Sequence, residues 1–361
     1  MLLTVLSILW PYLAMGAVVG AVAQYTNFCS VGAIADVMLA KDWRRARSWI
    51  MAAAVALVGT QAFAAAGLAN PQHSIYVYGG ANALFAAVGG VLFGYGMAIA
   101  GGCLQRALVR IGGGSIKSLV TVLVMAATGV PVSYAMNASA LWRATAWSRT
   151  VPSTLHEIIA DIFGLPWAQT TLAVISVVAL ALLVVCLVDR WFRQSRAHLW
   201  GGVVIGAVVA MAWLNPSPMP RGMNLLVDLI YSGLSIIPPY VGYDLGGFTV
   251  SPVVYAALVA LVLIGIVLGS FVVALMRRDL MLDRFMDRQD VQRHVIGGIL
   301  MGLGGAMAYG CTFGQGLSGF STLSITSFIA IAAMIAGCVW GIRALETGSA
   351  WRGLRLCFGR T

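Results

Sequence analysis

The chain has 361 residues, of which 60% are hydrophobic and only 9% are charged. Because soluble domains carry about 25% charged residues, this composition excludes an ordinary soluble protein and predicts an all-α polytopic membrane protein in a lipid bilayer. The formal net charge of +10 then indicates basic loops that face anionic lipid, and it is no signal for nucleic-acid binding.

Apolar stretches along the chain predict nine transmembrane helices. In chain order they cover residues 4–24, 49–69, 82–102, 118–137, 168–188, 199–214, 251–276, 294–310 and 322–342. A bilayer requires about 20 residues per helix, so the sixth and eighth stretches are short. A polar, Trp-containing segment over residues 138–167 indicates an extramembrane linker with an interfacial helix.

Polar or glycine-rich breaks interrupt this apolar pattern. They lie at residues 25–30, 101–104, 215–221 and 310–316. Irregular backbone at membrane depth is tolerated only where protein buries it or water lines it, so the breaks are candidates for a central pathway. The first, second and last breaks carry Cys29, Cys103 and Cys311. The third carries Met219 and prolines instead.

The other cysteines are Cys186, Cys338 and Cys357, which fall in ordinary spans or in the tail and are interpreted as apolar filler. None of the six cysteines forms a C-x-x-C pair or lies near a histidine at zinc-ligand spacing. We therefore expect no disulfide framework, no metal site and no cofactor.

An internal repeat relates two of the breaks. The segment GGVLFGYGMAIAGGC (residues 89–103) aligns without a gap on GGILMGLGGAMAYGC (residues 297–311), 208 positions later, with nine identities in fifteen positions. After a two-residue gap, Ser115 and Ser118 fall on Ser321 and Ser324. Chance rarely matches Gly-Cys breaks between two apolar segments, so the sequence predicts an internal duplication.

The placement of Lys and Arg sets the predicted orientation. With the N-terminus outside and the C-terminus inside, only Arg143, Arg149 and Arg221 of the 22 Lys and Arg lie on the outer side. The spans that end at Cys103 and Cys311 then run in opposite directions. We therefore expect an inverted repeat with short central half-helices, an architecture of transporters. The predicted units are a first repeat (1–145), a linker with a connecting helix (146–190), a second repeat (191–345) and a cytoplasmic tail (346–361).

The breaks carry the side chains of a soft anion site. A free thiol has a pKa of about 8.5, so the three central thiols are expected to be neutral at pH 7 and to act as polarizable, weak donors. Half-helix N-termini after the breaks add partial positive charge, and no carboxylate lies in the breaks. Arg106 and Arg110 fit two roles, steering of the substrate and positive-inside anchoring, of which anchoring is the preferred interpretation. Weaker candidates for contacts with anion oxygens or for entry are Asn27, Gln105, Thr312, Gln315 and Arg221.

These segments resemble the YeeE/YedE family. The similarity is carried by NFCSVGAIAD (residues 27–36), by GYGMAIAGGC (residues 94–103) and by GLGGAMAYGC with TFGQGLSG (residues 302–319). The family consists of integral membrane proteins of sulfur transport and includes thiosulfate permeases. The resemblance implies a nine-span inverted repeat whose central path is lined by Cys29, Cys103 and Cys311. It also implies that thiosulfate passes these thiols by transient S–H···S contacts without covalent bonding.

We therefore predict an inner-membrane permease for thiosulfate or a closely related sulfur-containing anion, and no enzyme. The resemblance also implies a partner, a small cytoplasmic sulfur-carrier protein separate from this chain. Three alternatives remain open: a selenium-compound transporter of the same family, a membrane thiol–disulfide oxidoreductase, and a non-transporting scaffold for the carrier protein.

Overall fold

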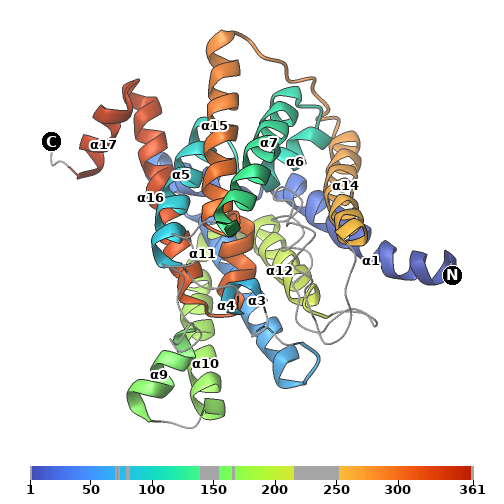
Figure 1. Cartoon of the computed structure of the whole chain (residues 1–361), viewed down its shortest axis with the longest axis vertical. Coiled ribbons are helices and arrows are strands. Elements are labelled where there is room, and N and C mark those ends of the chain that lie inside the picture. The colour runs from blue at the N-terminus through green and yellow to red at the C-terminus, as the bar shows by residue number, and fades with distance from the viewer. Residues whose placement is uncertain are drawn as a thin grey trace.

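The computed structural model describes residues 2–69, 71, 74–78, 82–138, 154–164, 167–214 and 252–358, and this part of the chain is a bundle of helices (Figure 1). The longer helices are α1 (Leu2–Thr26), α3 (Arg44–Ala65), α5 (Ala83–Ile99), α7 (Ile116–Ala138), α10 (Trp167–Leu187), α12 (Arg196–Met211), α14 (Pro252–Arg277), α15 (Arg288–Met307) and α16 (Ile325–Thr347). The shorter ones are α2 (Ser30–Ala35), α4 (Ile75–Tyr78), α6 (Leu104–Gly112), α9 (Leu155–Phe163), α11 (Arg190–Gln194) and α17 (Ala350–Phe358), with the π-helices η1 (Asp36–Ala40) and η3 (Gly314–Gly319).

Within the described residues, 7 helical segments are long and apolar enough to cross a membrane. They are Trp10–Ala40, Arg44–Ala65, Ala83–Gly112, Ile116–Ser133, Thr170–Leu187, Ala260–Arg277 and Ile325–Thr347. Helix α12 is a shorter apolar helix of 16 residues. The prediction of an all-α polytopic membrane protein is therefore confirmed, and the nine-span inverted repeat stays a prediction.

Helices α5 and α15, which carry the repeated segment, cross at glycines. A Cβ added at Gly89 would lie 2.7 Å from the carbonyl oxygen of Gly304, and one added at Gly297 would lie 2.8 Å from that of Gly96. Residue numbers rise along α5 as they fall along α15, so the two helices are antiparallel. Each contact maps onto the other by the 208-residue offset of the repeat. The two copies of the segment therefore run in opposite directions about a local two-fold axis.

The flanking helices pack in matched pairs around this crossing. Helix α16 packs on α5 as α7 packs on α15, and α14 packs on α1 as α3 packs on α12. Gly94 faces the carbonyl oxygen of Met334 in the first pair, and Gly302 faces that of Met125 in the second. Glycine at these positions lets the helix backbones approach closely, which favours association in lipid, where helices gain no hydrophobic driving force.

The two corners that follow the half-helices are held by loops from the opposite half. At the first corner the Ser115 hydroxyl donates to the Asp283 carboxylate at 3.1 Å. At the second corner the Ser324 hydroxyl donates to the carbonyl oxygen of Tyr76 at 2.7 Å. Each loop leads into the glycine-rich helix of the other copy, so these bonds tie the two halves together.

The geometry of the corners corrects the predicted alignment. Gly114 and Leu323 both have a left-handed backbone, with φ of 99° and 57°, and each immediately precedes a corner serine. Ser115 therefore corresponds to Ser324, and the predicted two-residue gap, which matched Ser115 with Ser321, is wrong. Between its cysteine and its corner serine, the second copy is one residue longer than the first (324 − 311 against 115 − 103).

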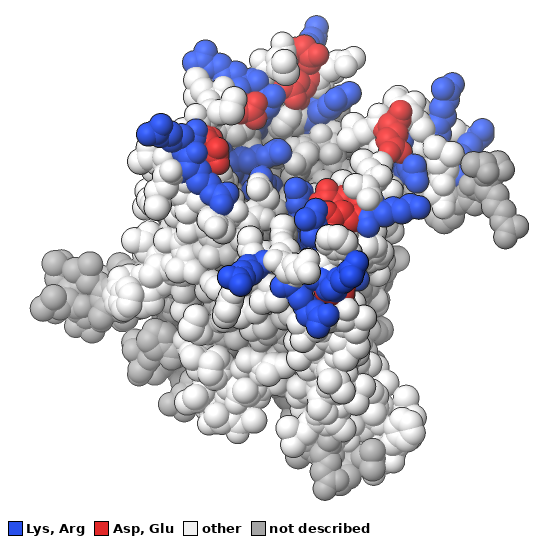
Figure 2. Space-filling view, turned by 180° about the vertical axis from the view of Figure 1, so that it is seen from behind, with Lys and Arg blue, Asp and Glu red and all other residues white. Residues whose placement is uncertain are grey.

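Charged side chains gather toward one end of the molecule. Figure 2 shows Lys and Arg, interspersed with Asp and Glu, over the upper part of the face that it displays, whereas the described residues in the lower part of this face are uncharged. Arg143, Arg149 and Arg221, which were expected on the outer side, lie outside the described residues. The predicted orientation requires a basic inner end of this kind.

We expect Gly304→Ala to destabilise the protein, because the new methyl group would meet the backbone of Phe93 and Gly89 in the crossing. Neither backbone can rotate away, so the cost is about 1–3 kcal/mol of overpacking. Gly305→Ala is the matched control, since the nearest atom to its methyl group is in the Phe93 ring at 3.5 Å. Thermal unfolding in detergent measures both variants, and equal unfolding temperatures would contradict the tight crossing.

Candidate functional site

The breaks that carry cysteines share one backbone geometry. Two positions before each cysteine the backbone is left-handed, at Asn27 (φ 52°), Gly101 (φ 70°) and Tyr309 (φ 50°). The next amide then donates to a carbonyl oxygen five residues back, in the pairs Phe28–Ala23 (3.1 Å), Gly102–Met97 (2.9 Å) and Gly310–Gly305 (3.0 Å). This is the Schellman cap of a helix C-terminus. It pairs backbone groups that would otherwise be bare at membrane depth.

Each of the three cysteines begins the next helix. The Cys29 sulfur accepts from the backbone N–H of Gly32, and the Cys311 sulfur accepts from that of Gly314, both at 3.4 Å. Cys103 is the N-cap residue of α6, but its side chain makes no cap hydrogen bond there. The three thiols therefore lie at the N-termini of short helices, as the sequence predicts.

The three breaks converge inside the bundle. The hydroxyl of Ser30, next to Cys29, lies 3.4 Å from that of Thr312, next to Cys311. From α6, Arg106 Nη2 donates to the side-chain oxygen of Asn27 at 3.0 Å. Cys103 lies within electrostatic range of the thiols of both Cys29 and Cys311. The buried Cys338 of α16, which was interpreted from the sequence as apolar filler, lies within electrostatic range of Cys29 and Cys103 too, so the thiol cluster includes this fourth cysteine beside the other three.

The cluster is almost closed from solvent. The exposed fractions of Cys29, Cys103 and Cys311 are 6%, 1% and 4%. Phe28 stacks on Trp49 with ring centroids 4.5 Å apart, and Trp49 meets Phe313 edge-on at 6.4 Å. Phe28 and Phe313 belong to the same buried core as Cys103 and Cys311, and Trp49 packs against this core.

Gln315 is already fully engaged within the protein. Its amide nitrogen donates to the carbonyl oxygens of Ala308 (2.7 Å) and Tyr309 (3.1 Å), and its side-chain oxygen accepts from the Ser327 hydroxyl at 2.6 Å. The side chain therefore joins the end of α15 to η3 and α16. This arrangement favours a structural role over a contact with substrate.

Gln105 shows the opposite pattern. Its side chain is completely buried, and neither polar atom of its amide has a hydrogen-bond partner among the described residues. Arg106, the next residue, uses Nη2 for Asn27, but its Nη1 is buried without a partner in the described part of the chain. An unpaired buried donor or acceptor costs about 1–3 kcal/mol, so such groups ask for an explanation.

The structure changes the weight of several sequence candidates. Arg106 was interpreted as a positive-inside anchor, yet its bond to Asn27 connects two of the breaks. Its position three residues after Cys103 was the feature of the sequence that could have indicated this contact. Trp49 was missed because nothing in an apolar helix marks one tryptophan as a neighbour of a distant cysteine. Arg221 and the third break, at residues 215–221, lie outside the described residues.

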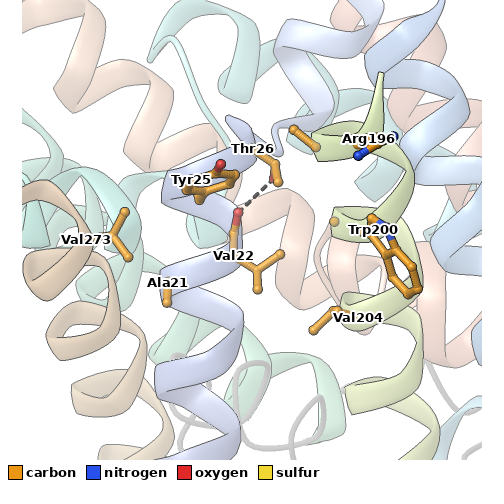
Figure 3. A pocket seen from close by; sticks show the side chains of 10 residues that line it. Ala21, Val22, Tyr25, Thr26, Arg196, Trp200, Val204 and Val273 are labelled. Atoms are coloured by element: carbon orange, nitrogen blue, oxygen red, sulfur yellow. Dashed lines mark hydrogen bonds between the residues drawn. The ribbon is translucent and has the colours of Figure 1, made fainter. Parts of the chain in front are cut away.

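A separate depression lies between α1, α12 and α14 (Figure 3). Its volume is about 430 Å³, and it is lined mainly by apolar side chains, with Tyr25, Thr26 and Arg196 toward one end. Thr26 donates to the Val22 carbonyl oxygen at 2.7 Å, so its hydroxyl is satisfied within α1. No cysteine lines this depression, which is therefore distinct from the thiol cluster.

Comparison with known proteins identifies the family of the chain. The family model described as "Sulphur transport" matches residues 25–340. A protein of Escherichia coli (strain K12) named thiosulfate transporter TsuA is 30% identical over 352 residues, which cover 91% of this chain and 92% of that protein. A protein of the same name from Spirochaeta thermophila is 25% identical over 346 residues, which cover 91% and 96%. The family match includes all three cysteine-bearing breaks.

The cap bonds predict how serine and alanine differ at Cys311. Serine is a preferred N-cap residue, so Cys311→Ser should keep the bond from Gly314 and unfold at or above the wild-type temperature. Cys311→Ala loses that bond, and we expect a loss of about 0.5–2 kcal/mol. Thermal unfolding in detergent compares the two variants. If serine were the less stable of the pair, the cap would not explain this position.

Proposed function

We propose that this chain, which belongs to the sulphur transport family, carries thiosulfate or a closely related sulfur-containing anion across the inner membrane. The family match places the chain among transporters and not among enzymes, which disfavours the alternative of a thiol–disulfide oxidoreductase. The finer proposal is that the anion passes Cys29, Cys103 and Cys311 in a central path.

The observation that carries the proposal is the convergence of three buried thiols at helix N-termini. A neutral S–H group is a weak donor and a soft partner, which suits the terminal sulfur of thiosulfate. Helix N-termini favour negative charge through their free N–H groups and the helix dipole. In the proposed passage the terminal sulfur moves between thiols through S–H···S contacts, and no covalent bond forms.

The remaining candidates take weaker roles in the proposal. Asn27 and Thr312 are polar groups beside the thiols, and Arg221 would attract the anion at the outer side. The N-terminus would lie outside and the C-terminus inside, with the basic end of Figure 2 toward the cytoplasm. A small cytoplasmic sulfur-carrier protein would receive the anion there.

Import of a dianion requires a driving force. Each charge that moves inward against 100 mV, inside negative, costs about 2.3 kcal/mol, so two charges cost about 4.6 kcal/mol. Rapid consumption of the anion inside the cell or a cotransported cation would offset this cost. The same requirement holds for a selenium-containing anion of equal charge.

We expect wild-type protein in proteoliposomes to take up labelled thiosulfate, and Cys103→Ala and Cys311→Ala to abolish uptake, because each removes one S–H donor from the cluster. Cys357→Ser is the matched control, since this cysteine is exposed in α17 and lies outside the cluster. Uptake that survives both alanine changes would contradict the thiol path but not the transporter. Wild-type protein that takes up selenium compounds and not thiosulfate would change the assigned solute.

We also expect uptake to fall as pH rises through the range in which the central thiols ionise. A neutral thiol donates to the anion, whereas a thiolate repels it, so the active form is the protonated one. The measurement is the initial uptake rate with equal pH on both sides of the vesicle, which removes any proton gradient. A rate that rises through this range would indicate thiolate chemistry instead.

A further inference from the structure

We propose that Gln105 and Arg106 form an oxygen-binding subsite beside Cys103, which holds the oxygens of the transported anion while the thiols contact its terminal sulfur. The inference rests on the proposed function and adds a determinant of specificity to it. In this subsite, Gln105 and Arg106 distinguish sulfur anions that carry oxygens from soft anions that carry none.

Gln105 is the first support for this subsite. Its amide is completely buried and has no hydrogen-bond partner among the described residues, two positions from a central cysteine. At the 208-residue offset of the repeat, the equivalent position is Phe313, whose ring packs edge-on against Trp49. The fold is therefore compatible with a fully apolar side chain at this place. The polar amide of Gln105 is therefore not required for packing at this position.

Arg106 supplies the charge. In the described part of the chain no carboxylate forms a salt bridge with it, although seven such bridges occur elsewhere. Nη2 donates to Asn27 in an exposed contact, whereas Nη1 is buried without a partner among the described residues and can donate to a ligand. A guanidinium group held on one side presents its other donors in a fixed direction, which suits the oxygens of an anion.

Cys103 is the third support. The sulfurs of Cys29 and Cys311 are occupied as acceptors by backbone N–H groups, whereas the Cys103 side chain makes no cap bond. The N-terminus of α6 is thus the least satisfied of the three, and it is the one followed by Gln105 and Arg106. Gln105 and Arg106 lie in the first turn of α6, where Gln105 is completely buried and Arg106 is partly exposed, so an anion at this N-terminus would lie between two side chains that point in different directions.

This arrangement matches an anion with two chemically different ends. The Gln105 amide nitrogen and Arg106 Nη1 donate to the oxygens, and the Cys103 S–H group faces the soft sulfur. Water that enters with the anion supplies a donor to the Gln105 side-chain oxygen. An anion such as thiocyanate, which has a soft sulfur and no oxygen, gains only the thiol contact.

The test compares Gln105→Leu with wild type in proteoliposomes. We expect KM for thiosulfate to rise about tenfold to hundredfold, the effect of one lost hydrogen bond to a charged group. Inhibition by thiocyanate should change little, so the preference for thiosulfate over thiocyanate falls. Arg106→Lys, which keeps the charge but loses the planar fork, should raise KM in the same direction. In detergent, the rise in unfolding temperature that thiosulfate causes in wild type should shrink in both variants.

Gln315→Leu is the matched control for stability. It removes three hydrogen bonds and should lower the unfolding temperature, whereas Gln105→Leu removes none seen in the described residues and should not. An unchanged KM in stable Gln105→Leu would overturn the subsite and leave the transporter intact. Wild-type protein without thiosulfate uptake would overturn the proposed function itself, and the subsite with it.

Discussion

The pairing of backbone groups at broken helices is the constraint on which the rest of this structure depends. Inside a bilayer no water is available to satisfy the carbonyl groups at a helix end, so each break has to close on itself or on a neighbour. The breaks before Cys29, Cys103 and Cys311 do this with the same left-handed cap. At the third of them, Gln315 pairs with two further carbonyl groups. Because the backbone groups at these helix ends are hydrogen-bonded, the chain can place a thiol at the start of the next helix.

The glycine crossing of α5 and α15 decides where the breaks meet. Because the two helices are antiparallel and nearly in backbone contact, their broken ends lead into half-helices that fold back into one bundle. The contact between Ser30 and Thr312 and the bond from Arg106 to Asn27 follow from that convergence. The site at the three breaks therefore depends on how the glycines of the α5–α15 crossing pack, although these glycines have no functional side chain.

The sequence predicts the helical class and the described breaks before Cys29, Cys103 and Cys311, because apolar length and glycine clusters report on membrane spans and their interruptions, whereas a path along these cysteines stays a prediction. The sequence does not predict which residues of different breaks contact one another. The contacts between Ser30 and Thr312 and between Asn27 and Arg106 span 282 and 79 positions, and no periodicity encodes them. The sequence alone does not distinguish the roles of Gln105 and Gln315. The structure does, because the buried Gln105 amide has no hydrogen-bond partner among the described residues, whereas the Gln315 amide has three.

The π-helix η3 explains why the two halves differ by one residue. A π-helix accommodates about one more residue per turn than an α-helix, and it is frequently found at functional sites. The extra residue between Cys311 and Ser324 is absorbed in η3, so the cysteine and the corner serine keep their places. The one-residue insertion is therefore accommodated within a single turn of the helix and does not lengthen a loop. The two copies of the repeated segment therefore differ in length between the cysteine and the corner serine.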